Sequence, residues 1–430
     1  MFQGRFHFLA KPSRSTPYYN TSGSGADDTS PVQEALKEEM KDELKNATFE
    51  STTLMDNLFP APQQIIDKVS KQLKNFDSVL RKADRRLAER SVYEPFASLL
   101  NTIHDKTMDQ LQMSTHNDNL CFSIYDREMA EGLDGAAPLK PDVIGTNRVI
   151  LPGEKIKWTD SYQMVPVEVK GDWLQLVAQA ATYARCIFAT GRRLFVLVIA
   201  LRHTTREVRF LFFHRSGLSS TTPAKLTTDE GWNRFISAVV GITACPNAHA
   251  AGLLGFSIPL DRSLCPIGRT LHARHCIRGR ATHIFEISLP NHVTFIVKES
   301  WPLRSRATEH EMFHQVSGRF GIPQIYKVEE IQGPDETPLG LQLYPADLKY
   351  WHLFKENIAS DEEPEPEQRA FIRLIFQDKA HSLKSAHSPH ELVKAIAHAM
   401  VGTSTPPLLL HAPKLLCRLS QPISGWVVTL

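Results

Sequence analysis

The sequence is poor in cysteine and has no long apolar run. Its 430 residues contain six cysteines, and no two of them are spaced as C-x-x-C. Scattered single thiols argue against a disulfide framework or a cysteine-based zinc site, and they favour a reducing compartment. No run of about 18 apolar residues occurs, so we expect no membrane span. The N-terminus lacks the apolar core of a secretion signal. We therefore predict an intracellular protein, cytoplasmic or nuclear, that does not engage a membrane.

An excess of charge of either sign is also lacking. The chain has 49 Lys and Arg against 47 Asp and Glu, a net charge of +2. A balanced total neither favours nor excludes nucleic acid, because it can hide a local basic groove. Hydrophobic residues make up 42% and charged residues 22%. This composition supports sizeable cores, and the length allows about two or three domains.

Changes in composition and periodicity divide the chain into four segments. Residues 1–61 are predicted to be a disordered tail, rich in Ser, Thr, Pro and Gly, with one charged helix. Residues 62–255 are predicted to form a module of helices followed by an α/β region. Residues 256–402 are predicted to form a small antiparallel sheet with a helix against it, and residues 403–430 an irregular tail without acidic residues. The fold class we expect is α+β.

The predicted elements follow from apolar periodicity and from turn residues. Helices are expected at residues 32–46, 62–103 with a break near Pro95, 174–189, 307–316 and 389–400. Strands are expected at residues 143–144, 165–169, 194–201, 208–213, 273–276, 284–287, 294–297, 325–328 and 371–376.

A first group of polar residues lies in the α/β region. Residues two apart in a strand share a face, so Glu168 and Lys170 point the same way, and Asp142 begins a neighbouring apolar run. Two carboxylates can hold a divalent cation such as Mg²⁺, which acidifies a water while a lysine stabilises the developing charge. Glu94, on the preceding helix, is a candidate third acid. The alternative is an ordinary Glu-Lys pair on a solvated strand face, which contributes little to stability.

These residues resemble the PD-(D/E)xK nuclease superfamily. The resemblance rests on Pro141-Asp142, on Glu168-Val169-Lys170, and on Gln179 and Tyr183 in the following helix. It implies that Asp142, Glu168 and Lys170 bind metal and act in catalysis. It also implies that Gln179 and Tyr183, one helical turn apart, contact nucleic acid.

A second group lies in the predicted antiparallel sheet. Gly279 is in a turn between two strands, Lys298 ends a third strand, and Glu309 follows on a helix. In protein kinases such an arrangement covers ATP, with the strand lysine on the phosphates and the helix glutamate pairing with that lysine. Taken singly, Lys298 is equally an ordinary strand-end lysine, and Glu309 an acid on a helix surface.

The two groups together resemble the fungal-type protein kinase family. The resemblance rests on Lys298-Glu-Ser-Trp301, on Phe213-His-Arg-Ser-Gly217 and on Val167-Glu-Val-Lys170, and it spans roughly residues 60–402. It implies an α/β region followed by a kinase-like N-lobe and the start of an incomplete C-lobe, at which ATP, and Mg²⁺ with it, would bind. The residues implied at the nucleotide are Lys298, Glu309 and Gly279, with strand 371–376 leading to an adenine hinge near Gln377 and Asp378.

Departures from the kinase pattern are large. The turn has one glycine, Gly279, followed by Arg280 and Ala281. His-Arg-Asp and Asp-Phe-Gly are absent, and no acid follows Glu391. We therefore predict a truncated kinase-like protein with weak nucleotide binding and no phosphoryl transfer to Ser or Thr of a protein substrate. The alternatives are a metal-dependent nuclease, for which nucleic acid is the partner, and a non-catalytic module that binds a protein partner.

Overall fold

A computed structural model describes most of the chain between residues 30 and 394. The described residues are 30–73, 79–82, 88–112, 120–130, 139–151, 153–158, 160–161, 163–245, 247, 250–274, 276–289, 293–306, 309–315, 323–333, 336–354, 363–377, 381–382, 388–391, 393–394 and 426–427. Residues 1–29 of the tail predicted over residues 1–61, Asp378, and most of the segments 389–400 and 403–430 lie outside them. The described part of that predicted tail contains helices at residues 30–44 and 54–58 and a strand at residues 48–51.

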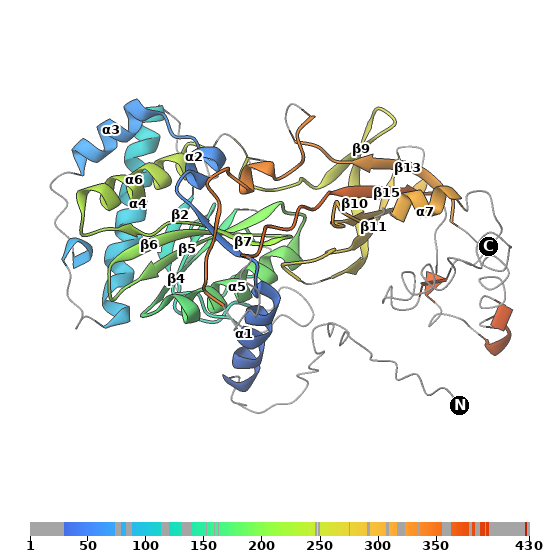
Figure 1. Cartoon of the computed structure of the whole chain (residues 1–430), viewed down its shortest axis with the longest axis horizontal. Coiled ribbons are helices and arrows are strands. Elements are labelled where there is room, and N and C mark those ends of the chain that lie inside the picture. Colours follow the sequence, from blue (N-terminus) through green and yellow to red (C-terminus); the bar gives the residue numbers. More distant parts are fainter. Residues whose placement is uncertain are drawn as a thin grey trace.

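A nine-stranded mixed sheet organises the first half of the molecule (Figure 1). Its strands are β1 (Thr48–Ser51), β2 (Cys121–Ile124), β3 (Val143–Thr146), β4 (Met164–Lys170), β5 (Phe195–Arg202), β6 (Glu207–His214), β7 (Gly217–Thr221), β8 (Ala224–Lys225) and β14 (Lys349–Tyr350). Their order is β14-β1-β7-β6-β5-β4-β3-β2, with β8 paired to β6. The pairs β4/β5 and β1/β7 are parallel, whereas the other pairs are antiparallel.

Helices cover both faces of this sheet (Figure 1). On one side lie α2 (Leu54–Leu58), α3 (Gln63–Gln72), the short turns η1 (Val79–Arg81) and η2 (Glu89–Val92), α4 (Tyr93–Leu111) and α6 (Asp229–Thr243). On the other side lie α1 (Ser30–Leu44) and α5 (Trp173–Thr190). The central strands β5 and β6 are therefore buried on both faces, which explains their nearly continuous apolar sequences.

Local sequence explains where the two longest helices begin. Pro95 lies in the first turn of α4, where its missing N–H costs no hydrogen bond. Asp172 precedes α5, and its side chain accepts a hydrogen bond from the Gln175 N–H. The predicted helix over residues 174–189 is confirmed, and Pro95 lies in the first turn of a helix as predicted. The helix predicted from residue 62 up to Pro95 is wrong beyond Gln72, where α3 ends, and the described residues 79–81 and 89–92 form short 3₁₀ turns instead.

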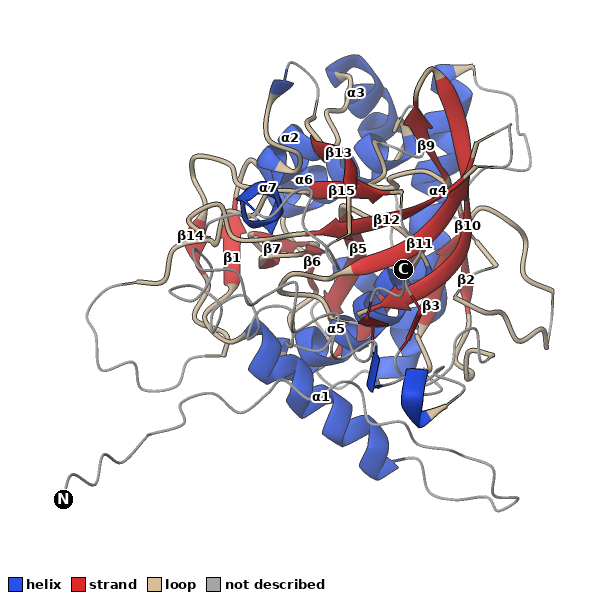
Figure 2. Ribbon diagram, turned by 90° about the vertical axis from the view of Figure 1, so that its right-hand side faces the viewer, coloured by secondary structure: helices blue, strands red, loops and turns tan. Residues whose placement is uncertain are grey.

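A six-stranded antiparallel sheet forms the second half (Figure 2). It contains β9 (Ser257–Leu260), β10 (Ser263–Ala273), β11 (His283–Ser288), β12 (Thr294–Ser300), β13 (Ile325–Glu330) and β15 (Ile372–Phe376), in the order β13-β15-β12-β11-β10-β9. Helix α7 (Glu309–Gln315) lies between β12 and β13 along the chain. The α+β class and a small antiparallel sheet with one helix are confirmed, and both are compatible with a kinase-like lobe. A further strand pair joins β16 (His381–Ser382) to β17 (Trp426–Val427).

One segment of the second half crosses back onto the first sheet. The short turn η4 (Leu341–Leu343) and β14 follow β13 in the chain, yet β14 pairs with β1. The Asp347 carboxylate accepts hydrogen bonds from Ser51, Thr52 and Thr53 at 2.6 to 2.8 Å. These contacts tie the two halves together, and no sequence pattern predicted them.

The predicted strand at residues 273–276 is wrong. Strand β10 begins at Ser263 and ends at Ala273. The chain leaves the sheet there because Arg215, from the first half, holds the following turn: its guanidinium donates to the Cys276 carbonyl, and its own carbonyl accepts from the Gly279 N–H. Helices long and apolar enough to cross a membrane do not occur in the described part of the chain.

Candidate functional site

Strand β12 places neighbouring side chains on opposite faces of the six-stranded sheet. Ile296 packs in an apolar cluster with Leu374 and Phe376 on the face that carries α7. Val297 packs in a different cluster on the other face. By this alternation Lys298 joins Ile296 on the α7 face, and the strand aims the lysine at the start of the helix.

Lys298 and Arg280 bind the two oxygens of one carboxylate. The Lys298 Nζ lies 2.5 Å from Glu309 Oε1, and the Arg280 Nη2 lies 2.9 Å from Glu309 Oε2. The side chain of Lys298 is 9% exposed, that of Glu309 13% and that of Arg280 41%. Lys298 and Glu309, which the sequence paired, therefore do lie together, and Arg280 is a third member that the sequence did not indicate.

Packing at α7 holds the glutamate in this place. Glu309 is the first residue of α7, and Phe313, one turn later, packs its ring 5.6 Å from that of Phe376 on β15. Burial alone raises the pKa of Glu309, but the Lys298 ammonium and the Arg280 guanidinium outweigh burial and hold that pKa below its usual range. The carboxylate is therefore ionised at neutral pH.

The glycine turn reaches this cluster through Arg280. Gly279 has φ of +123°, a conformation that favours glycine, and its N–H donates to the Arg215 carbonyl at 3.0 Å. The Arg280 carbonyl accepts from the Trp301 N–H at 2.7 Å. These bonds fix the backbone on both sides of the arginine. Gly279 thus shapes the turn, and the described contacts to Glu309 come from Arg280 and Lys298.

On the opposite face of the sheet, Glu299 joins the two halves of the molecule. It is 3% exposed and receives two hydrogen bonds of 2.6 Å from Arg192, which follows α5. Arg373, across the strand pair, lies 2.9 Å from Glu299 and 3.0 Å from Glu329. Glu299, the residue next to Lys298, therefore anchors strand β12 to the α/β half.

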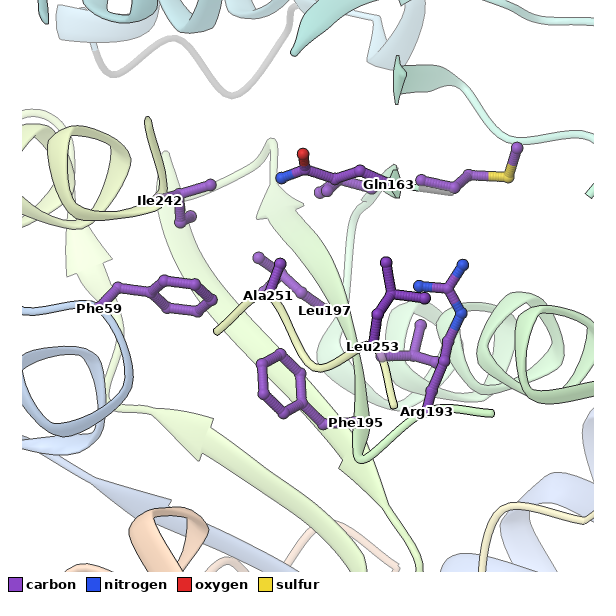
Figure 3. A pocket seen from close by; sticks show the side chains of 11 residues that line it. Phe59, Gln163, Arg193, Phe195, Leu197, Ile242, Ala251 and Leu253 are labelled. Carbon is purple, nitrogen blue, oxygen red and sulfur yellow. The ribbon is translucent and has the colours of Figure 1, made fainter. Parts of the chain in front are cut away.

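Gln377, which the resemblance implied near the adenine, directly follows strand β15 of the six-stranded sheet. It is exposed, and its N–H donates to the Gln324 carbonyl at 3.4 Å. The cavity in Figure 3 lies in the first half, between Phe59, Phe195 and Arg193. It has room of about 20 Å³, close to one water molecule. This cavity is too small for a nucleotide and does not include Lys298 among its lining residues.

A second buried cluster gathers the acids and lysine of the α/β region. Lys170 Nζ lies 2.9 Å from Glu168 Oε1, 2.9 Å from Glu89 and 3.7 Å from Asp142. The Tyr183 hydroxyl lies 2.8 Å from Glu168 Oε2.

Further partners complete this second cluster. The Gln179 amide donates to the Tyr183 hydroxyl at 3.1 Å, as their spacing of one helical turn predicted. Asp142 accepts from the Val169 N–H at 2.9 Å and from the Tyr93 hydroxyl at 2.6 Å.

The structure places Glu94 outside this second cluster. Glu94 is exposed on α4 and lines a different groove with Asn101 and Asp105. Glu89 instead occupies the position of a third acid that the sequence suggested for Glu94. It accepts a hydrogen bond from the Tyr93 hydroxyl and pairs with Lys170. Glu89 lies in the short turn η2, directly before α4, and no sequence pattern indicated it.

Electrostatics in the second cluster favour a closed, partly protonated network. Burial, and after it the Asp142 carboxylate, raises the pKa of Glu168 to about 8. Burial lowers the pKa of Lys170, but Glu168 and Asp142 outweigh it and raise that pKa above its usual range. In the described residues, no three His, Cys, Asp or Glu side chains come together as a metal site.

Comparison with known proteins identifies a family whose match includes both Lys298 and most of the α/β cluster. A family described as "Fungal protein kinase" matches residues 153–405, more than half of the chain. No curated protein and no solved structure matches. The matched range begins before β4 and includes β12 and α7.

Proposed function

The chain belongs to the fungal protein kinase family, and from this premise we propose that its six-stranded sheet binds ATP through Lys298. In this proposal the lysine contacts the α- and β-phosphates, and Glu309 orients the lysine. The observation that carries the proposal is the buried ion pair of 2.5 Å between these two residues, on strand β12 and helix α7.

Physical chemistry supports a functional role for this pair. Taking two charges out of water costs several kcal/mol each, so a buried ion pair contributes little net stability compared with apolar residues of similar volume. A lysine is a flexible point charge that must be aimed before it can bind phosphate well. Glu309, fixed by α7 and Phe313, provides that aim.

We propose binding without phosphoryl transfer for this sequence. Its 430 residues contain neither His-Arg-Asp nor Asp-Phe-Gly, and these motifs supply the base and the metal ligand of kinase chemistry. Among the described residues, no three His, Cys, Asp or Glu side chains come together to hold Mg²⁺. The chain's own contribution is to hold the phosphates with Lys298 and to orient that lysine through Glu309.

Equilibrium binding of ATP, measured by isothermal titration calorimetry, tests this proposal. Lys298→Ala should abolish or strongly weaken binding, and Glu309→Ala should weaken it because the lysine loses its aim. Lys327→Ala is the matched control, since Lys327 lies in the same sheet and pairs with Glu329 at 2.6 Å but is 44% exposed. Equal affinities for all three variants would reject the ATP site. Incubation with radiolabelled ATP and generic protein substrates should give no phosphate incorporation.

A second candidate function is metal-dependent cleavage of nucleic acid at the α/β cluster. The observation that favours it is the assembly of Asp142, Glu168 and Lys170, with distances of 2.9 to 3.7 Å between the lysine and the acids. Against it, Glu168 is 2% exposed and the lysine fills the space between the carboxylates. Mg²⁺-dependent cleavage of DNA or RNA that disappears in Glu168→Ala would establish it. Absence of both ATP binding and cleavage would favour the interaction-module hypothesis.

A further inference from the structure

We propose that Arg280 is a second phosphate-binding cation, which acts with Lys298 on the phosphate chain of the nucleotide. This inference rests on the proposed ATP site. It goes further because it assigns phosphate binding to Arg280, which stands beside Gly279 at a position where the kinase pattern has another glycine. It predicts a site that recognises phosphate charge with two protein cations.

The first argument is the charge of the cluster. Lys298 and Arg280 share the single carboxylate of Glu309. Among these three side chains, two positive charges face one negative charge, which leaves an excess of one positive charge. Because Lys298 and Glu309 are largely buried, a charge beside them attracts an anion more strongly than it would in bulk water. A phosphate group is the anion that the neighbouring Lys298 is already proposed to bind.

The second argument is the hydrogen-bonding capacity of the arginine. A guanidinium has five N–H donors in a fork that matches phosphate oxygens. Arg280 uses Nη2 on Glu309, whereas its Nε is buried and makes no hydrogen bond to any described residue. The side chain as a whole is 41% exposed, against 9% for Lys298. Arg280 is thus the more exposed cation of the pair, and its guanidinium has more donors than the one that Glu309 occupies.

The third argument is that the arginine can contact a ligand without any change in the backbone. The Gly279 N–H and the Arg280 carbonyl are both held by hydrogen bonds, to Arg215 and Trp301. Rotation of the side chain alone can move the guanidinium from Glu309 to a phosphate while Lys298 keeps the carboxylate. If Arg280 instead blocked the site, its removal would strengthen nucleotide binding, and this opposite sign makes the test decisive.

The test compares ATP, ADP and adenosine as ligands of the full chain, by calorimetry, in buffers with EDTA and with Mg²⁺. Arg280→Ala should weaken ATP binding by roughly tenfold or more, the loss expected for one hydrogen bond to a charged group. Adenosine binding should not change, because it has no phosphate. Arg280→Lys should restore part of the affinity. Arg304→Ala is the matched control, since Arg304 is 33% exposed and pairs with Glu330 in the same sheet.

The outcomes separate this inference from the proposed function. If ATP binding requires Lys298 but Arg280→Ala binds ATP as tightly as the wild type, or more tightly, the assignment of Arg280 is wrong and the ATP site stands. If the wild type does not bind ATP, or Lys298→Ala leaves binding unchanged, both fail. Circular dichroism checks the fold of each variant. Should Arg280→Ala not fold, Arg280→Lys decides: full wild-type affinity for ATP together with unchanged discrimination against ADP overturns the assignment.

Discussion

Replacing Glu299 with alanine should destabilise the chain by about 3 kcal/mol, the lower end of the loss when one partner of a buried ion pair is removed. The reason is that Arg192 and Arg373 would remain buried without the carboxylate they share. The lower end applies because each arginine keeps another partner. Arg373 retains Glu329 at 3.0 Å, and Arg192 retains the Leu254 carbonyl at 3.0 Å.

Urea denaturation followed by tryptophan fluorescence measures this loss. The control is Glu330→Ala, which removes a partly exposed partner of Arg304 and should cost less than about 1 kcal/mol. The urea concentration at the midpoint of unfolding should fall clearly for Glu299→Ala and hardly change for Glu330→Ala. Equal, small changes would refute the claim that Glu299 joins the two halves. Because Glu299 neighbours Lys298, the same variant should also weaken ATP binding.

Three further results are expected. The pKa of Glu168 is raised to about 8 from an ordinary value of 4.5. Between these two pH values the native state therefore keeps a proton that the unfolded state has lost. The free energy of unfolding therefore falls as pH rises through that window, and Glu168→Gln should flatten the fall; parallel curves of urea midpoint against pH would contradict this. Asp347→Ala removes four hydrogen bonds that hold the segment crossing back to the first sheet. It should lower the free energy of unfolding by about 2 kcal/mol and speed proteolysis near β14. An unchanged rate of cleavage near β14 would count against the contact. Phe313→Ala removes the ring that seats α7 on Phe376; it should weaken ATP binding more than adenosine binding, and equal losses would show that the helix does not aim Lys298.

The pairing of Lys298 with Glu309 was predictable because it depends on regular elements. A strand that alternates its faces and a helix that follows it leave few places for the two side chains. The clustering of Asp142, Glu168 and Lys170 was predictable for the same reason, because the strands β3 and β4 are adjacent in both sequence and sheet.

Contacts made by turns and by distant segments were not predictable in this way. Arg280 lies in a turn whose direction depends on Arg215, about 60 residues earlier in the chain. The pairing of β14 with β1 joins two short strands separated by about 300 residues, and no local pattern specifies such a register. Glu94 was the only acid proposed from this region, because the short turn η2, which places Glu89 beside Lys170, was not anticipated.

Labelling with an ATP analogue whose terminal phosphate carries an amine-reactive acyl group tests the central claim most directly. The reagent acylates the lysine nearest the phosphates, and mass spectrometry of the digest identifies it. We predict a label on Lys298 that excess ATP prevents and that Lys298→Ala abolishes without new labelling of Lys327. Labels spread over exposed lysines and insensitive to ATP would contradict the nucleotide site.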